Sequence, residues 1–470
     1  MSQDTETGQP AEEAEGSSRI AIIVTVVSLA LLGLCWALAA NGVPYTRLGF
    51  LLMQVVVISI VIWQVCDPFA DAAQWVGTVL RVPGSVRGAT LDAVASSMPE
   101  LFSGIFFVVV AITTATGTPA EIAESGQEGY GATLATCAGS AIYNMILIPA
   151  FCALVISFCR KSRPTIDVER EVISRDGMWF IGCEAVLIIF LFQDRMYWWM
   201  ALVLLGMYCV YIFQLYRDAR RYQRAMDAIH RHLGEVGEDT PTDEIVETLR
   251  AENIHTSPML VDAIKHSADE DDDEEPETAG IFYGMIDIPL NKVTATLVLL
   301  VATLLAAGAC YWLVEVTRGT ATELGVVLGH KVPVFFVAVI LAAAASSVPD
   351  TFLAIGAAMR GDDSGAVSNA FGSNIFDICI CLSIPLLVNS YLLGWGPVPL
   401  TQEGGEPIAG LVDLRILLAT LTVVTLLIMW HNRQLTRNKA FVLCGLYGLF
   451  MAYAVAGSMG FSLLSMLGLH

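Results

Sequence analysis

Eleven long stretches with almost no charged residue constrain the fold of this chain more than any other feature. A helix needs about 20 apolar residues to cross a bilayer core roughly 30 Å thick, and backbone in contact with lipid must satisfy its hydrogen bonds internally. We therefore expect an all-α polytopic membrane protein with eleven spans. The stretches lie at residues 20–40, 48–79, 86–113, 131–159, 177–192, 196–216, 293–316, 332–359, 364–393, 411–430 and 440–467.

The composition agrees with a membrane protein. Of the 470 residues, 55% are hydrophobic and only 15% are charged, which is too little polar surface for a soluble core of this size. The net charge of −21 is local, because residues 1–18 carry five acidic and no basic residues, and residues 218–290 carry nineteen acidic against six basic ones. We expect residues 1–18 to be disordered and residues 218–290 to form a large acidic loop.

The basic residues predict the orientation. If residues 218–290 are cytoplasmic, strict alternation of the spans places seventeen Lys and Arg residues on the cytoplasmic side and five on the other. This count sets aside the three basic residues that lie deep in the loop. This bias is the positive-inside pattern, so we expect a cytoplasmic loop in a multi-pass membrane protein. The span at 20–40 ends in Ala37-Leu38-Ala39, which resembles a signal-peptidase site, but acidic residues precede it. We favour a retained N-terminal helix over a cleaved signal peptide.

Two segments about 250 residues apart share one unusual pattern inside apolar stretches. Ser96-Ser97-Met98-Pro99-Glu100 matches Ser346-Ser347-Val348-Pro349-Asp350. A Gly-Ser motif follows in both copies, ending at Asn144 in the first and at Asp377 in the second. Leaving the first span aside, five spans precede the acidic loop and five follow it. An odd number of spans inserts the two copies in opposite directions, so we predict inverted five-helix repeats at residues 47–217 and 291–470 that share one site.

Each part of the repeated pattern suits a cation. Pro99 and Pro349 each remove a backbone donor, which predicts a broken helix with free carbonyl oxygens. Glu100 and Asp350 follow directly, and a carboxylate in the membrane needs compensation, which hard cations such as Ca²⁺ and Na⁺ provide by taking oxygen ligands. One such copy alone would more simply be a kink with a satisfied polar group, but two matched copies favour a cation site. The hydroxyls expected to complete it belong to Ser96, Ser97, Ser140, Ser346, Ser347 and Ser373.

Two further acids in apolar stretches are less clearly linked to this site. Glu184 lies near the middle of its span, where structural hydrogen bonding is the simpler interpretation. Asp92 lies two turns before Glu100 and could either line an inner vestibule or reach the membrane interface.

At these residues the sequence resembles the cation/calcium exchanger superfamily, and most closely the potassium-dependent sodium/calcium exchangers. The resemblance covers about two-thirds of the chain, without the acidic loop. Two positions depart from that branch: Ser96 stands where it usually has Gly, and Asp92 stands where it is apolar. The motifs that carry the resemblance include Val65-Cys66-Asp67, Pro99-Glu100-Leu101-Phe102, Gly139-Ser140-Ala141 and Gly372-Ser373-Asn374-Ile375-Phe376-Asp377-Ile378.

The resemblance implies roles for individual residues. Glu100 and Asp350 would be the main calcium ligands, and Asp377 matches the acid that the family links to potassium. Asn144 would be a polar neighbour of the site. The hydroxyls implied as sodium or calcium ligands belong to Ser97, Ser140, Ser347 and Ser373.

The number of carboxylates gives an independent expectation about the ions. Two carboxylates balance one Ca²⁺, whereas three, counting Asp377, balance Ca²⁺ with K⁺, or three monovalent ions. Asn144 holds the equivalent place in the first copy and is neutral. The asymmetry therefore favours one extra monovalent cation, although a protonated Asp377 fits equally well.

The sequence thus predicts a secondary active antiporter that exchanges Na⁺ for Ca²⁺, with K⁺ moving together with Ca²⁺, by alternating access. The nearest alternative is a calcium/proton antiporter that cycles by protonating Glu100 and Asp350. We expect no enzymatic activity and no cofactor, since the chain has no nucleotide-binding G-x-x-x-x-G-K-[ST] loop. The expected partners are small inorganic cations and the lipid bilayer, with no nucleic acid.

Overall fold

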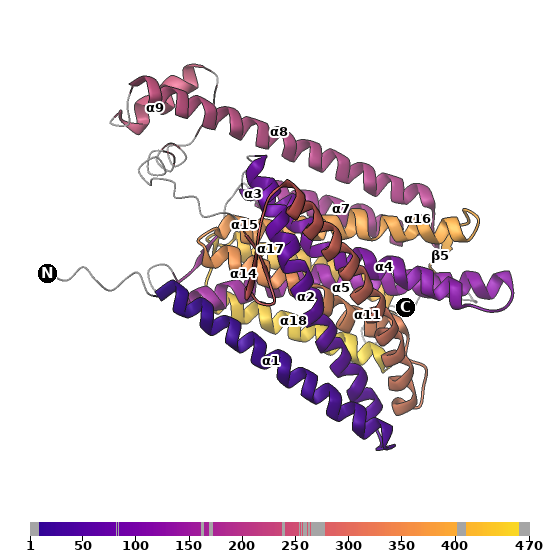
Figure 1. Cartoon of the computed structure of the whole chain (residues 1–470). Coiled ribbons are helices and arrows are strands. Elements are labelled where there is room, and N and C mark those ends of the chain that lie inside the picture. The colour runs from indigo at the N-terminus through magenta and orange to yellow at the C-terminus, as the bar shows by residue number, and fades with distance from the viewer. Residues whose placement is uncertain are drawn as a thin grey trace.

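Helices make up most of the molecule (Figure 1). The computed structural model describes residues 9–80, 82, 84–160, 164–168, 173–236, 240–252, 254, 256, 261, 264, 278–401 and 410–459. The helices of the described residues before the acidic loop, together with α9 within it, are α1 (Gln9–Ala40), α2 (Thr46–Val79), α3 (Gly84–Arg87), α4 (Ala93–Thr114), α5 (Pro119–Cys159), α7 (Met178–Leu191), α8 (Trp198–Val236) and α9 (Thr242–Ala251). Those after it are α11 (Lys292–Leu328), α12 (Val334–Val337), α13 (Ala343–Ser346), α14 (Val348–Met359), α15 (Asp363–Phe376), α16 (Ser383–Leu392), α17 (Leu411–Trp430) and α18 (Arg437–Ser458).

Short irregular elements connect or interrupt these helices. The π-helical turns in the described residues are η1 (Gly88–Asp92), η2 (Ile173–Gly177), η3 (Ala338–Ala342) and η4 (Asp377–Cys381). Three antiparallel strand pairs join β1 (Ile166–Asp167) to β6 (Gln434–Leu435), β2 (Arg195–Met196) to β5 (Val398–Pro399), and β3 (Thr278–Ile281) to β4 (Ile286–Pro289).

Ten helical segments of the described chain are long and apolar enough to cross a membrane. The eleventh predicted span, at residues 177–192, corresponds to α7, which has only 14 residues. Because α7 continues directly from the five residues of η2, the combined segment reaches roughly 28 Å at 1.5 Å per residue. The predicted architecture of one N-terminal helix and ten core spans is therefore confirmed.

The two repeats have the same order of elements. α2 corresponds to α11, the segment α3–η1–α4 to α12–η3–α13–α14, α5 to α15–η4–α16, α7 to α17, and α8 to α18. The π-helical turns Gly88–Asp92 and Ala338–Ala342 lie at the same distance before Glu100 and Asp350, respectively. The repeats therefore share a local irregularity next to their carboxylates, a place where π-helical turns often accompany function.

The helix breaks differ from the prediction. α4 runs through Pro99 without a break, and in the second repeat the break lies at Ser347, between α13 and α14. A proline removes only one helical hydrogen bond, and a buried helix such as α4 can absorb that loss. Pro349 instead occupies the first turn of α14, where its missing N–H would have no helical partner in any case.

Several boundaries also differ. Residues 113–130 were expected to form a loop, but α5 begins at Pro119, where the side chain of Thr118 accepts a hydrogen bond from the backbone N–H of Glu121 in a capping box. α8 continues to Val236 as one helix instead of ending near residue 216, and α9 lies within the predicted acidic loop. α1 begins at Gln9, inside the predicted disordered stretch, while residues 1–8 and the acidic run 269–275 lie outside the described residues.

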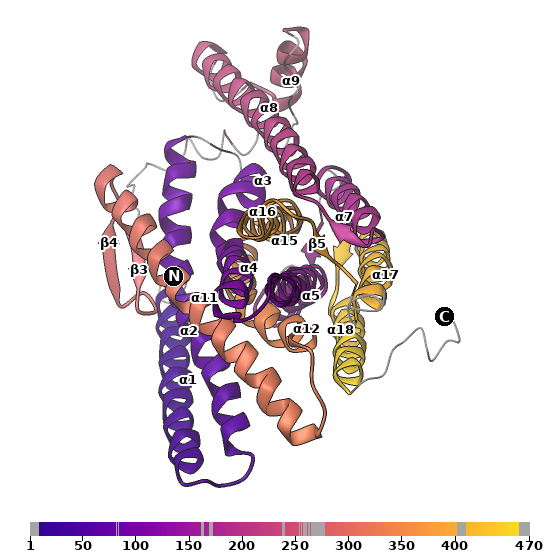
Figure 2. The same ribbon diagram turned by 90° about the vertical axis from the view of Figure 1, so that its right-hand side faces the viewer.

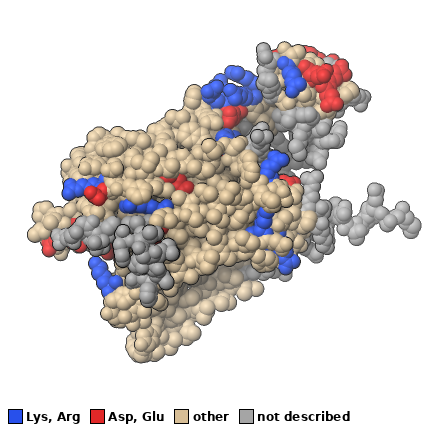
Figure 3. All heavy atoms as spheres, turned by 180° about the vertical axis from the view of Figure 1, so that it is seen from behind, with Lys and Arg blue, Asp and Glu red and all other residues tan. Residues whose placement is uncertain are grey.

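α5 lies at the centre of the bundle. Figure 2 shows it nearly end-on, with α4, α12 and α15 close by, α1, α2 and α11 on one side, and α17 and α18 on the other. The helices α4, α5 and α15 are mostly buried, whereas α1, α2 and α11 expose many large apolar side chains, as expected for surfaces in contact with lipid. Figure 3 shows an uncharged band between the charged residues near the two ends of the molecule. We call the end that carries α9 the loop side.

The strands β3 and β4 form a hairpin that packs across α2 immediately before α11. The backbone N–H of Gly280 donates to Asp71 Oδ2 at 3.0 Å, and that of Tyr283 donates to Gln64 Oε1 at 2.9 Å. The Tyr283 ring meets Trp63 edge-on, and Trp63 stacks on Phe352 of α14 with 3.8 Å between ring centroids. The described end of the loop segment is thus fastened to α2.

Candidate cation-binding site

The three predicted carboxylates lie at the interface between the repeats. Glu100 lies in α4, two turns after η1, Asp350 lies in the first turn of α14, and Asp377 is the first residue of η4. All three side chains are completely buried. Three carboxylates away from water need positive charge or hydrogen-bond donors around them.

The hydroxyl of Ser140 joins groups from both repeats. Its Oγ lies 3.0 Å from Glu100 Oε1, 3.1 Å from Asp377 Oδ2 and 2.9 Å from Ser347 Oγ. A hydroxyl has a single hydrogen to donate, so Ser140 can donate to only one of the two carboxylates at a time. The other carboxylate then faces the Ser140 oxygen without its hydrogen, which is an arrangement that a cation would stabilise. Ser347 Oγ, 3.4 Å from Glu100 Oε1, can also donate to Glu100.

Asp350 is held by donors from both repeats. Ser373 Oγ donates to Asp350 Oδ1 at 2.8 Å, and Asn144 Nδ2 donates to Asp350 Oδ2 at 3.3 Å. Ser96 Oγ lies 3.1 Å from Ser373 Oγ, which extends the network to α4. Asn144 Nδ2 also lies 3.4 Å from Ser140 Oγ, so the surroundings of Asp350 and Glu100 form one continuous hydrogen-bond network.

The structure therefore brings together most of the predicted site residues. Ser97 and Ser346 are completely buried beside them; the Ser97 hydroxyl has no hydrogen-bond partner, and the Ser346 hydroxyl donates to the carbonyl of Ala343 in its own helix. The predicted residues that share the continuous network are Ser96, Glu100, Ser140, Asn144, Ser347, Asp350, Ser373 and Asp377.

Unpaired oxygens make the site suitable for a hard cation. An unsatisfied buried polar group costs about 1–3 kcal/mol, and carboxylate, amide and hydroxyl oxygens are the ligands that such cations prefer. In the described chain, no three His, Cys, Asp or Glu side chains converge into a closed metal centre, because hydroxyls and amides separate the carboxylates. The buried oxygens of the site without a partner are Ser97 Oγ, Glu100 Oε2, Asn144 Oδ1 and Asp377 Oδ1.

Two glycines allow the repeats to cross closely at this site. A Cβ added to Gly139 of α5 would lie 2.3 Å from the carbonyl oxygen of Val339 in η3. A Cβ added to Gly372 of α15 would lie 2.7 Å from the Cα of Ala89 in η1. Each Gly-Ser helix thus crosses the π-helical turn of the other repeat, and this crossing places the next residue, Ser140 or Ser373, at the interface.

Sequence reasoning missed two asparagines near the site. Asn374 Nδ2 donates to the carbonyl of Ala141 at 3.1 Å, which links α15 to α5. Asn369 lies one helical turn before Ser373 and is 3% exposed. Its spacing of four residues from Ser373 was the available signal, because residues four apart share a helix face.

The two other acids lie elsewhere. Glu184 of α7 is buried and accepts a hydrogen bond from Thr422 of α17 at 3.1 Å, in keeping with a structural role. Asp92 ends η1 and lies 3.9 Å from Arg87.

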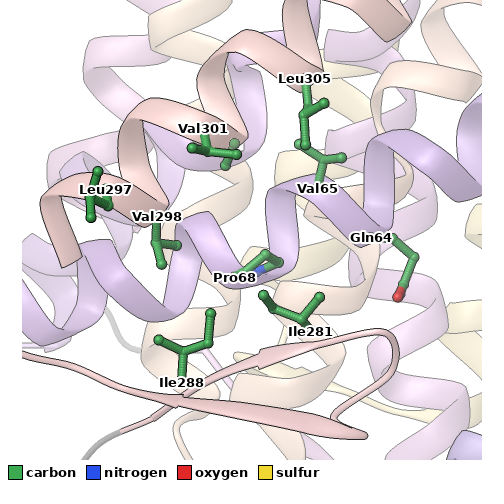
Figure 4. A pocket seen from close by; sticks show the side chains of 10 residues that line it. Gln64, Val65, Pro68, Ile281, Ile288, Leu297, Val298, Val301 and Leu305 are labelled. Carbon is green, nitrogen blue, oxygen red and sulfur yellow. The ribbon is translucent and has the colours of Figure 1, made fainter. Parts of the chain in front are cut away.

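A separate pocket of about 250 Å³ lies between α2, α11 and the β3–β4 hairpin (Figure 4). Side chains from all three elements point into it, among them Pro68, Ile288 and Val298. Nearly all of its lining is apolar and none of the carboxylates above contributes to it, so it lacks the oxygen ligands that a small cation requires.

Two inverted repeats that share one buried, acidic, oxygen-lined site are the arrangement of secondary transporters. The chain matches the family model described as "Sodium/calcium exchanger protein" over residues 49–217 and 294–456, which is more than half of its length. It therefore belongs to the sodium/calcium exchanger protein family, and the predicted membership of the cation/calcium exchanger superfamily is confirmed.

Curated relatives agree with this family, and a solved structure shares the fold. Sodium/potassium/calcium exchanger 3 of Rattus norvegicus is 26% identical over 212 residues, which cover 43% of this chain and only 30% of that exchanger. Sodium/potassium/calcium exchanger 2 of Gallus gallus is 22% identical over 516 residues, covering 83% of this chain and 74% of that one. The crystal structure of the H⁺/Ca²⁺ exchanger CAX aligns with a TM-score of 0.55 at 14% identity, over 94% of this chain and 92% of that one. The structural likeness shows a common fold.

Proposed function

We propose that this protein exchanges Na⁺ for Ca²⁺ across a membrane, with K⁺ moving together with Ca²⁺, at the site formed by Glu100, Asp350 and Asp377. The observation that carries the proposal is the sharing of Ser140 Oγ between Glu100, Asp377 and Ser347, which belong to both repeats. When one repeat moves against the other, a site built from both repeats can open to one side of the membrane and then to the other, as alternating access requires.

The buried carboxylates would couple the two ion fluxes. Without a cation, the site leaves two or three carboxylates in a medium of low dielectric constant with few donors, and such a state is costly to carry across the membrane. The site with bound cations is neutral or nearly so, and it can turn from one side of the membrane to the other more easily than the empty site. Exchange of one kind of ion for the other is then favoured over leak of either.

Asp377 supports the part of the proposal that concerns potassium. It adds a third buried carboxylate where the first repeat has neutral Asn144, and its Oδ1 has no partner. Ca²⁺ balances two carboxylates, so the third calls for one monovalent cation. The names of the curated relatives, which are sodium/potassium/calcium exchangers, favour K⁺ for that role.

We also propose that the loop side faces the cytoplasm. The support is the excess of basic residues at the ends of the spans on that side, seventeen against five on the other, by the positive-inside rule. Protease access to residues 218–290 in intact cells and in inverted membrane vesicles tests this orientation.

Calcium uptake into proteoliposomes tests the proposed function. Sodium, potassium and proton gradients are imposed separately on vesicles that contain the purified chain, with Glu100→Gln as the inactive control. We expect radioactive Ca²⁺ uptake to require an outward sodium gradient and to increase with K⁺ on the calcium side. Uptake that ignores sodium and follows a pH gradient would replace this proposal by calcium/proton antiport.

A further inference from the structure

We propose that Asn369 is an additional cation ligand, placed where an ion passes between the carboxylates and the loop side. The inference rests on the proposed function and extends it, because it makes the two access routes to the site unequal.

Asn369 lies on the face of α15 that carries the site. Asn369, Ser373 and Asp377 follow one another at steps of four residues, so their side chains are aligned along one face. Ser373 donates to Asp350, and Asp377 contacts Ser140. Because α15 enters the membrane at Asp363 from the loop side, Asn369 lies one helical turn nearer to that side than Ser373.

The amide oxygen of Asn369 is buried and unpaired. The side chain is 3% exposed, its amide lies within hydrogen-bond reach of the Asp350 carboxyl, and its Oδ1 has no hydrogen-bond partner. A buried amide loses its hydration without compensation unless another group or an ion pairs with it. With Nδ2 turned toward Asp350, Oδ1 is available to a cation, and amide oxygens are normal ligands of Ca²⁺ and Na⁺.

The first repeat has no such group at the equivalent place. There the residue four positions before Ser140 is Thr136, which is buried and donates its hydroxyl to the carbonyl of Ala132 at 3.0 Å. Since the repeats are inverted, Thr136 lies on the side of the site opposite to the loop side. Its hydroxyl hydrogen is already used within α5, whereas Oδ1 of Asn369 has no partner. We therefore expect tighter calcium binding from the loop side than from the other side.

The test measures calcium affinity separately from each side of the membrane. Full-length protein is reconstituted into vesicles, and its orientation is assayed by protease access to the loop. For Asn369→Ala we expect the half-saturating Ca²⁺ concentration to rise about tenfold on the loop side and less than about twofold on the other. Asn369→Asp keeps an oxygen at this position and should restore most of the affinity. The matched control, Thr136→Ala, should leave both values within about twofold of the wild type.

A second measurement separates ion binding from a structural role. Ca²⁺ bound only by the folded protein raises its melting temperature in detergent. We expect the calcium-dependent rise to shrink in Asn369→Ala while the melting temperature without Ca²⁺ stays near that of the wild type.

Distinct results would overturn this inference and the proposed function. An Asn369→Ala variant with unchanged affinity on both sides, or with equal losses on both sides, contradicts the role of Asn369 as a loop-side ligand. A lower melting temperature without any change in calcium dependence assigns the residue a structural role instead. If wild-type vesicles show no sodium-coupled calcium flux, the proposed function is wrong, independently of Asn369.

Discussion

Asn144 donates a hydrogen bond to Asp350 across the interface between the repeats, with 3.3 Å between Nδ2 and Oδ2. In the first repeat, Asn144 holds the position that Asp377 holds in the second. A neutral amide thus supports one main carboxylate, while a third carboxylate approaches Glu100 through Ser140. The two halves of the site follow the same order of elements and differ by one negative charge.

That charge predicts the effect of Asp377→Asn. The substitution leaves two carboxylates, which one Ca²⁺ balances, so we expect sodium-driven calcium uptake to persist and its dependence on K⁺ to disappear. Calcium uptake as a function of K⁺ concentration in proteoliposomes measures this. Asp413→Asn, which changes a buried acid that accepts a hydrogen bond from Tyr453, should keep the potassium dependence. An unchanged response to K⁺ in Asp377→Asn would refute the role of Asp377.

Glu100→Gln should abolish exchange. Removing one partner of a buried charged arrangement costs about 3–5 kcal/mol, which corresponds to a loss of at least about 100-fold in ion affinity. Initial rates of calcium uptake at saturating sodium gradient measure the effect. Glu184→Gln, at another buried glutamate in a membrane helix, should retain uptake within about threefold, because Glu184 contacts Thr422 and lies outside the ion network. Equal losses in the two variants would count against the proposed site.

Gly139→Ala and Gly372→Ala should each destabilise the protein and stop transport. The new methyl group would lie 2.3 Å from Val339 O in the first variant and 2.7 Å from Ala89 Cα in the second, and backbone cannot move aside as a side chain can. Overpacking of this kind costs about 1–3 kcal/mol or more. Thermal unfolding in detergent should show melting temperatures several degrees lower. Gly206→Ala in α8, where no atom lies within 4 Å of the added Cβ, should show no such fall.

The ion pair between Arg160 and Asp363 should stabilise the loop side of the bundle. Arg160 Nη1 and Nη2 donate to Asp363 Oδ1 and Oδ2, both at 3.0 Å, which ties the end of α5 to the start of α15. The hydrogen bond to Asp363 raises the pKa of the Arg160 guanidinium above its ordinary value. Both side chains are partly exposed, so we expect a coupling free energy of about 1 kcal/mol.

A double-mutant cycle with Arg160→Gln and Asp363→Asn, followed by unfolding in detergent, measures this coupling. If the two substitutions are additive, the pair contributes nothing to stability, and the contact between α5 and α15 depends on their other interactions, such as the hydrogen bond from Asn374 to Ala141.

The sequence was sufficient for the architecture and for most of the site. Uncharged stretches locate membrane helices because few other backbone structures satisfy their hydrogen bonds inside a bilayer. The repeated Ser-Ser-x-Pro-acid motif indicated both Glu100 and Asp350. The close crossing at Gly139 and Gly372 gives a physical reason for the repeated Gly-Ser motif. The roles of the site residues in ion binding stay predictions.

Other features depend on packing that sequence patterns do not encode. Pro99 was expected to break its helix, yet the irregularity lies upstream at Gly88–Asp92, where η1 meets Gly372 of the other repeat. The β3–β4 hairpin was not expected, because its anchoring on Asp71 and Gln64 arises only from the tertiary fold. Asn369 lacked any motif of its own; besides its spacing from Ser373, its burial with an unpaired Oδ1 distinguishes it.

The reciprocal crossing of Gly139 with η3 and of Gly372 with η1 bears on how such a protein could have originated. A half-length ancestor with five spans could form this crossing only by inserting into the membrane in both directions and pairing with an oppositely inserted copy of itself. When two such halves are joined through residues 218–290, one polypeptide contains both directions of insertion. Once joined, the halves no longer had to remain identical, and a neutral amide at position 144 could coexist with a carboxylate at position 377.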